Sequence, residues 1–168
     1  MNSNRTKKLA LYAILLALAL VLSFVESVAL PSAIPLPGVK LGLSNIITLF
    51  TLYALGGIPC AVILILRCIM AAFFGGGVTS LLFSLAGGIL ALLTMIFTKR
   101  MGTFSIYGVS IAGSAAHGIG QILAAALIFG STSIFMYLPI MLLASLVTGA
   151  VIALITQFLL ARIRMNKK

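Results

Sequence analysis

Six long runs of apolar residues dominate the chain, separated by short segments rich in proline, glycine or basic residues. The runs cover residues 9–30, 43–56, 58–74, 79–98, 105–129 and 135–161. A helix needs roughly 20 mostly apolar residues to cross a bilayer, at a rise of about 1.5 Å per residue. The pattern therefore predicts an all-α integral membrane protein of six transmembrane helices, forming a single transmembrane domain over residues 1–168.

The segments between the runs have the composition of turns. Residues 31–40 contain three prolines, which preclude a regular helix, so we expect a Pro-rich loop between the first and second helices. Gly56 and Gly57 come shortly before Pro59, a pattern typical of one helix ending and another beginning. Three consecutive glycines at 75–77 indicate the end of the third span.

The charged residues define a topology. The chain is 62% hydrophobic and only 7% charged, whereas roughly a quarter of the residues in a soluble domain are charged. Its net charge is +10, but the basic residues stand at the ends of the apolar runs, not in a stripe along a polar surface, which argues against nucleic-acid binding. Lysine and arginine near span ends favour the cytoplasmic side. We therefore expect a multi-pass protein of the cell membrane with both termini in the cytoplasm.

The alternative for the first run is a cleaved signal peptide, although the run is longer than such peptides favour.

A shortage of acidic residues limits the possible chemistry. Glu26 is the only one, whereas paired carboxylates for acid–base catalysis and aspartate-bound magnesium both need more. The G-x-x-x-x-G-K-[ST] loop for ATP is also missing. Cys60, Cys68 and the lone His117 cannot complete a metal site. We expect no catalytic residue, no cofactor and no metal in this chain, and any role in an enzyme would be an accessory one.

Ionisable side chains within a membrane are costly and are therefore functional candidates. Three occur inside the apolar runs, namely Glu26, Arg67 and His117. His117 and Gln121 are four residues apart and share a helix face. The alternative roles are a structural ion pair of Glu26 with Arg67 or Lys40, and simple hydrogen bonding between helices. The candidate substrate-binding residues are Asn45, Arg67, His117, Gln121, Glu26 and Lys40. This set favours a ligand with an anionic or hydrogen-bonding group and an apolar body.

Small residues recur along one face of two predicted helices. One set is Gly108, Ala112, Ala116, Gly120 and Ala124, and the other is Ala10, Ala13 and Ala17. Small residues four apart allow another helix to approach closely. We expect Ala13 and Ala17 to form a docking surface for a partner helix, with packing inside the bundle as the alternative.

Three segments resemble a known family. They are PGVKLGLSN at residues 37–45, SLAGG at 84–88 and GSAAHGIGQ at 113–121. Together they are similar to the Gx transporter family, which is also catalogued as heptaprenyl diphosphate synthase component I. The resemblance covers nearly the whole chain. The family usually has asparagine after the histidine, where this chain has Gly118.

The six-helix plan also resembles the substrate-specific S components of energy-coupling-factor transporters. Those proteins bind a vitamin or similar small molecule from outside and associate with a transmembrane coupling subunit and two ATPases. Their first helix commonly has an alanine-x-x-x-alanine docking motif, which Ala13 and Ala17 match. The resemblance implies the same class of ligand and the same partners here.

We therefore expect a substrate-binding subunit of such a transporter, with a pocket that opens to the outside and residues 31–43 as its lid. Its partners would be a small-molecule ligand, membrane lipid, the coupling subunit and the ATPases. One alternative is the non-catalytic membrane component I of heptaprenyl diphosphate synthase, which would work with a soluble prenyl synthase. The other is a membrane scaffold or small channel without a specific ligand.

Overall fold

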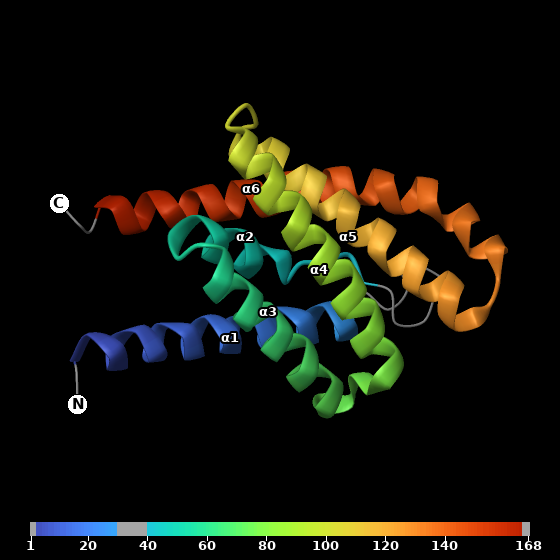
Figure 1. The fold of residues 1–168 in the computed structure, drawn as a ribbon, viewed down its shortest axis with the longest axis horizontal. Coiled ribbons are helices and arrows are strands. Elements are labelled where there is room, and N and C mark those ends of the chain that lie inside the picture. The colour runs from blue at the N-terminus through green and yellow to red at the C-terminus, as the bar shows by residue number, and fades with distance from the viewer. Residues whose placement is uncertain (1–2, 30–39, 166–168) are drawn as a thin grey trace.

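A computed structural model of the chain describes residues 3–29 and 40–165, and every long element in them is a helix. Figure 1 shows their arrangement. In chain order they are α1 (Ser3–Ala29), α2 (Asn45–Ala54), α3 (Gly57–Ala71), the π-helix η1 (Ala72–Gly76), α4 (Gly77–Met101), α5 (Ile106–Phe129), the 3-10 helix η2 (Thr132–Tyr137) and α6 (Leu138–Met165). No strand occurs in these two stretches, so the predicted all-α class is confirmed.

Five of the helical segments are long and apolar enough to cross a membrane. The exception is α2, which has ten residues and a length of about 15 Å at 1.5 Å per residue. We expected a short span over 43–56, and the structure has instead a short apolar helix that cannot cross the hydrocarbon layer by itself. At the three glycines, where the third span was expected to end, the helical run from α3 through η1 stops at Gly76, and α4 begins at Gly77, whose φ is +67°.

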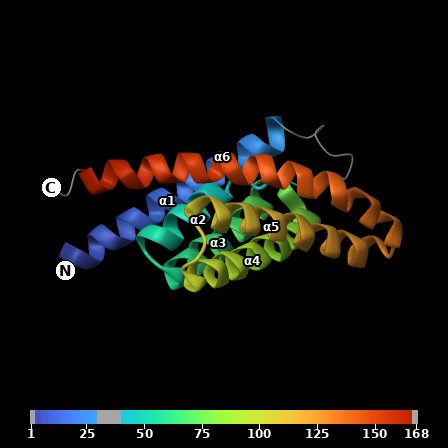
Figure 2. The same ribbon diagram turned by 90° about the horizontal axis from the view of Figure 1, so that it is seen from above.

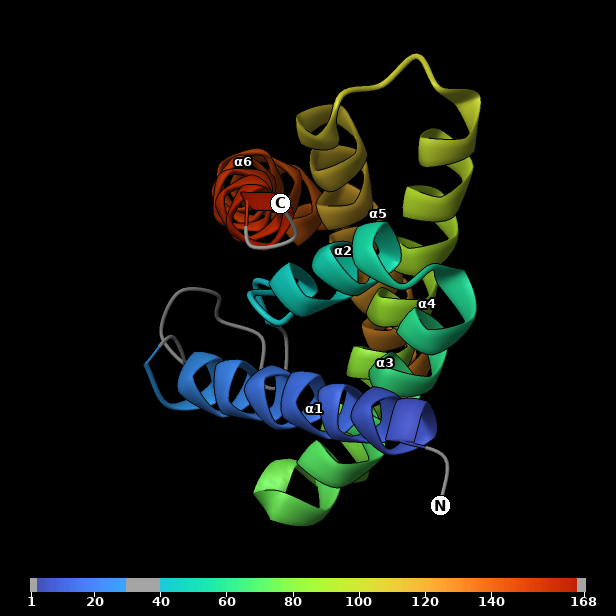
Figure 3. The same cartoon turned by 90° about the vertical axis from the view of Figure 1, so that its left-hand side faces the viewer.

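The short helix α2 lies in the middle of the bundle. Figure 3 shows it between α1 on one side and α5 and α6 on the other, and it contacts α1, α3, α4 and α6. Eight of its ten residues are buried. Protein rather than lipid therefore surrounds α2, and its apolar composition reflects a place in the core.

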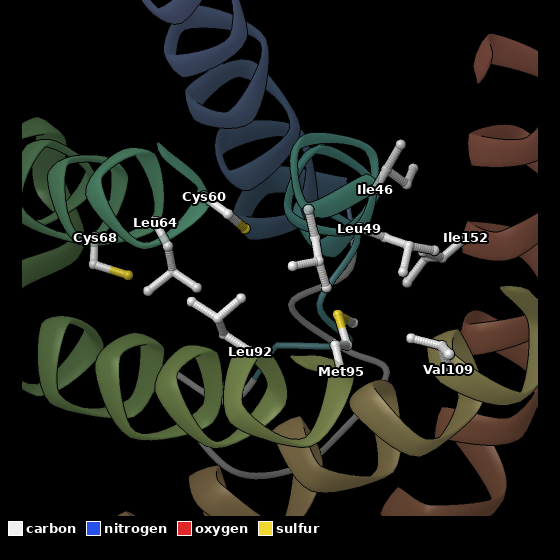
Figure 4. Close-up of a cluster of buried hydrophobic side chains, with 10 residues drawn as sticks. Ile46, Leu49, Cys60, Leu64, Cys68, Leu92, Met95, Val109 and Ile152 are labelled. Atoms are coloured by element: carbon white, nitrogen blue, oxygen red, sulfur yellow. The ribbon is translucent and has the colours of Figure 1, made fainter. Parts of the chain in front are cut away.

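The core beside α2 is a cluster of aliphatic and sulfur-containing side chains (Figure 4). Leu49 of α2, Leu64 of α3 and Met95 of α4 belong to it. Cys60 and Cys68 belong to the same cluster, and both are free and 1% exposed. The two thiols thus fill space in the apolar core.

Helix α5 packs most extensively against α4 and α6, and small residues permit the close approach. A Cβ on Gly120 would lie 2.6 Å from the carbonyl oxygen of Ala86 on α4. A Cβ on Gly149 of α6 would lie 2.8 Å from the Cα of Ile111 on α5. These helices therefore touch backbone to backbone, which is the packing expected of the small-residue face on α5.

The start of α1 and the end of α6 lie at the same end of the bundle (Figures 1 and 2). The carboxyl end of α2 is tied to the end of α4 by Lys99, whose Nζ donates to the carbonyl oxygen of Leu52 at 2.8 Å. The same Nζ lies 4.5 Å from the centre of the Tyr53 ring, a cation–π contact. That the end of the bundle with the start of α1 and the end of α6 faces the cytoplasm stays a prediction.

Replacing Gly120 with alanine should loosen the contact between α4 and α5. The new methyl group meets backbone atoms of α4, which cannot move aside as a side chain can. We expect a loss of about 1–3 kcal/mol in stability, measured as a lower midpoint of thermal unfolding in detergent. Gly57→Ala is the matched control, because its Cβ would make only an ordinary 3.4 Å contact with Ile96. Equal midpoints for the two variants would contradict the close-packing explanation.

Candidate ligand-binding site

The single carboxylate of the chain holds the segment that enters α2. Glu26 lies in the second half of α1 and is 3% exposed. One of its oxygens accepts the backbone N–H of Gly42, and the other accepts that of Leu43 at 3.2 Å. Lys40 and Arg67 lie close enough for their charges to act on this carboxylate, but its hydrogen bonds go to the backbone. Glu26 therefore joins α1 to the start of α2.

Gly42 brings this segment against α5. Its φ of +86° is in the left-handed region, which favours glycine. A Cβ here would lie 2.9 Å from Nδ2 of Asn45 and 3.2 Å from Cδ2 of His117. Only a residue without a side chain can therefore occupy the gap between the start of α2 and His117.

Gln121 connects the same segment to His117. Its Oε1 accepts the backbone N–H of Lys40 at 2.9 Å, which fixes the orientation of the amide. Its Nε2 must then donate to Nε2 of His117, 2.5 Å away, so the imidazole is neutral and holds its proton on Nδ1. That Nδ1 lies near the carbonyl of Gly87 but makes no hydrogen bond of normal geometry among the described residues. The predicted pairing of His117 and Gln121 on one helix face is present.

Two of the predicted site residues, Asn45 and Arg67, lack such partners. Asn45 is 0% exposed, and neither its Oδ1 nor its Nδ2 has a hydrogen-bond partner in the described part of the chain. Arg67 on α3 is 4% exposed, its Nε is likewise without a partner, and its Nη2 makes only a 3.5 Å contact with Sγ of Cys68. Leaving such groups unsatisfied in an apolar interior is costly. Asn45 and Arg67 therefore retain unused hydrogen-bonding capacity.

Lys40 lies between α1 and α2, with its Nζ 3.4 Å from Oγ of Ser23. Burial lowers the pKa of the amine, and the nearby Glu26 carboxylate opposes this effect. The backbone of Lys40 is held by Gln121, so the position of the amine at the edge of α1 is set by the same polar network.

A pocket of about 560 Å³ adjoins Lys40. It runs along the second half of α1, and α3 and η1 close its other side. Its lining residues are Leu20, Val21, Ser23, Phe24, Ser27, Val28, Lys40, Ala71 and Phe74. The wall is therefore mainly apolar, with one cation and two hydroxyl groups. That combination suits a ligand with an apolar body and an anionic or polar head.

Of the six residues predicted to bind substrate, only Lys40 lines this pocket. Glu26, His117 and Gln121 form the polar network, which holds the segment before α2. Asn45 and Arg67 are the two residues with unpartnered groups. The sequence analysis missed Ser23, Ser27 and Phe24, although Ser23 and Ser27 are four residues apart on the face that also holds Glu26. That spacing is the signal that could have identified them.

Two further predictions concern surfaces. The proposed lid, residues 31–43, lies mostly outside the described residues, which resume at Lys40. Ala13 and Ala17 lie on an exposed face of α1, so the bundle itself leaves this pair open to lipid or to a partner. Among residues 3–29 and 40–165, no group of three metal-ligating side chains occurs.

Comparison with known protein families identifies the family of the chain. The family model described as heptaprenyl diphosphate synthase component I matches residues 15–159. The chain belongs to this family. The matched range contains the whole polar network and the pocket, as well as Ala17 but not Ala13.

The heptaprenyl diphosphate synthase component I family is the one indicated by the three sequence motifs, and that resemblance is confirmed. No curated protein and no solved structure matches the chain. The likeness to energy-coupling-factor S components therefore has no support from these comparisons.

Replacing Gln121 with leucine should destabilise the protein. The change leaves the Lys40 N–H and the His117 ring without partners in a buried environment, at a cost of about 1–3 kcal/mol for each unsatisfied group. The measurement is the thermal unfolding midpoint of the purified protein. Gln157→Leu is the matched control, because Gln157 is exposed on α6. If Gln121→Leu unfolds at the control's temperature, the network does not hold the segment before α2.

Proposed function

We propose that the chain is the non-catalytic membrane component of heptaprenyl diphosphate synthase. In this role it binds an isoprenoid ligand in the pocket beside α1 and assembles with a soluble synthase subunit. The main support is the pocket of about 560 Å³, which combines apolar walls with the amine of Lys40. Membership of the component I family supports the assignment of the enzyme.

The acidic residues explain why the catalytic step belongs to a partner. Elongation of prenyl diphosphates uses magnesium held by aspartate clusters, and this chain has one acidic residue in total. Both oxygens of that residue, Glu26, accept backbone N–H groups. The chain can therefore bind and present a ligand, while the metal chemistry needs a second, aspartate-rich protein.

The pocket suits an isoprenoid because one of its walls faces the membrane. Val21 and Phe24 on α1 line it and are 57% and 62% exposed. An apolar chain can enter from the bilayer past these residues while its head group reaches Lys40. We take the chain to act as one transmembrane unit in the cell membrane, with its basic ends in the cytoplasm.

Filling the pocket should weaken ligand binding without disturbing assembly. We expect Ala71→Phe to weaken binding of farnesyl diphosphate at least about tenfold, because the ring occupies space lined by Phe24 and Phe74. Binding is measured with radiolabelled ligand and purified protein in nanodiscs. Val147→Phe on the exposed face of α6 is the control.

The same preparations test the partner. Mild solubilisation should co-purify an aspartate-rich soluble synthase with the wild type and with both variants. Absence of the synthase together with absence of prenyl-ligand binding would overturn the proposal.

One set of observations favours a second function, capture of a small molecule for an energy-coupling-factor transporter. The pocket lies in the half of α1 away from its start, which is the outer side if both termini are cytoplasmic. Ala13 and Ala17 are exposed nearer the start of α1 than any pocket residue, and a coupling subunit would dock there.

This second function predicts that bulky residues on α1 break a membrane complex. Ala13→Trp with Ala17→Trp should remove co-purifying coupling subunit and ATPases, because a helix can no longer approach this face. The matched control is Val147→Trp with Val151→Trp, an exposed pair at the same spacing on α6. If the wild type brings down no ATPase subunit, the transport role is wrong.

A further inference from the structure

Arg67 is a buried cation that forms no ion pair with any described residue. A guanidinium stays protonated at any physiological pH, and an unpaired charge in an apolar interior is strongly unfavourable. Arg67 is nevertheless 4% exposed, with a weak contact to the Cys68 sulfur and a free Nε in the described part of the chain. Some anion must complete its surroundings, or the residue must move.

The protein cannot supply that anion. Glu26 is the only acidic side chain in the whole sequence, and its two oxygens accept the N–H groups of Gly42 and Leu43. Even if its charge is counted fully, one negative charge faces two positive ones, those of Lys40 and Arg67. The polar end of the bundle therefore has an excess of at least one positive charge.

The two cations belong to the same end of the pocket. Arg67, Ala71 and Phe74 follow one another at intervals of four and three residues, so they lie along one face of the helix that continues from α3 into η1. Ala71 and Phe74 line the pocket, and so does Lys40. Arg67 thus lies one helical turn from the lining residue Ala71, on the same face of α3.

We propose that Lys40 and Arg67 together bind an anionic, phosphate-bearing head group at the polar end of this pocket. The inference deepens the proposed function, on which it rests, by naming the chemistry of the ligand's head. The planar fork of Arg67 suits bidentate contact with phosphate oxygens. Lys40 adds a point charge, and with Glu26 counted as negative the two cations still lack at least one negative charge.

Phosphate on an apolar body has two sources in a membrane, an isoprenoid phosphate and an anionic phospholipid. The test uses the full chain in phosphatidylcholine nanodiscs, with farnesol, farnesyl monophosphate and farnesyl diphosphate as probes and phosphatidic acid as a competing lipid. We expect affinity to rise from the alcohol to the diphosphate. Arg67→Gln should weaken diphosphate binding about 10- to 100-fold, as expected for loss of a charge-assisted contact, and should change farnesol binding less than about twofold.

Further variants separate charge from folding. Arg67→Lys keeps the charge without the fork and should recover part of the affinity. Lys40→Gln should weaken the diphosphate and not the alcohol, while Arg100→Gln, at the exposed end of α4, should change neither. Without ligand, Arg67→Met should unfold at the wild-type temperature or above, because it removes an uncompensated charge. A lower temperature would make Arg67 a structural residue and overturn the inference.

The remaining outcomes distinguish this inference from the proposed function. Equal binding of farnesol and farnesyl diphosphate, unaffected by Arg67→Gln, would overturn the head-group site and leave an isoprenoid-binding component intact. Binding of phosphatidic acid with the same dependence on Arg67, and no binding of prenyl probes, would support the phosphate site and refute the isoprenoid role. If none of the four probes binds, both proposals are wrong.

Discussion

The fold depends on how one carboxylate is used. Backbone N–H groups outside a regular helix need other partners, and in a membrane protein water does not readily supply them. Glu26 satisfies the N–H groups just before α2, and Lys99 satisfies a carbonyl at the other end of that helix. With both ends held by side chains of longer helices, α2 can be short and central, and it need not reach either surface of the bilayer.

The buried polar residues divide into two kinds by their hydrogen bonds. Gln121 and His117 bind each other and the backbone of Lys40, so their role is to hold the chain. Asn45 and Arg67 have donors or acceptors that no described residue uses. The contacts of Gln121 and His117 hold the segment before α2, although Nδ1 of His117 itself has no described partner. The unused groups of Asn45 and Arg67 are the ones that we propose a ligand contacts. In the sequence all of these residues are polar groups within apolar runs, and only their hydrogen bonds distinguish one kind from the other.

The sequence was sufficient for the features that depend on local spacing. The helical class follows from the long apolar runs, and the pairing of His117 with Gln121 follows from an interval of four residues. It did not reveal that α2 is enclosed by protein, because hydropathy is the same for a side chain packed on lipid and one packed on a neighbouring helix. Nor did it identify the partners of Glu26, which are backbone groups 16 and 17 positions away and are brought near only by the chain's return towards α1. A charged neighbour such as Arg67 was the natural expectation, since sequence patterns show side chains but not free N–H groups.

The position of Lys40 relative to the two membrane surfaces separates the two proposed roles. The pocket occupies the half of α1 far from its start, and the start of α1 and the end of α6 share one end of the molecule (Figure 1). If the basic clusters keep that end in the cytoplasm, the amine of Lys40 faces the outer half of the bilayer. A ligand captured from outside reaches it directly. A cytoplasmic synthase would instead meet the opposite end of the bundle, so a head group held at Lys40 would lie on the wrong side for chain elongation. With the basic ends in the cytoplasm, the synthase role therefore requires a movement that brings the head group to the cytoplasmic side, whereas the transport role begins with capture from outside.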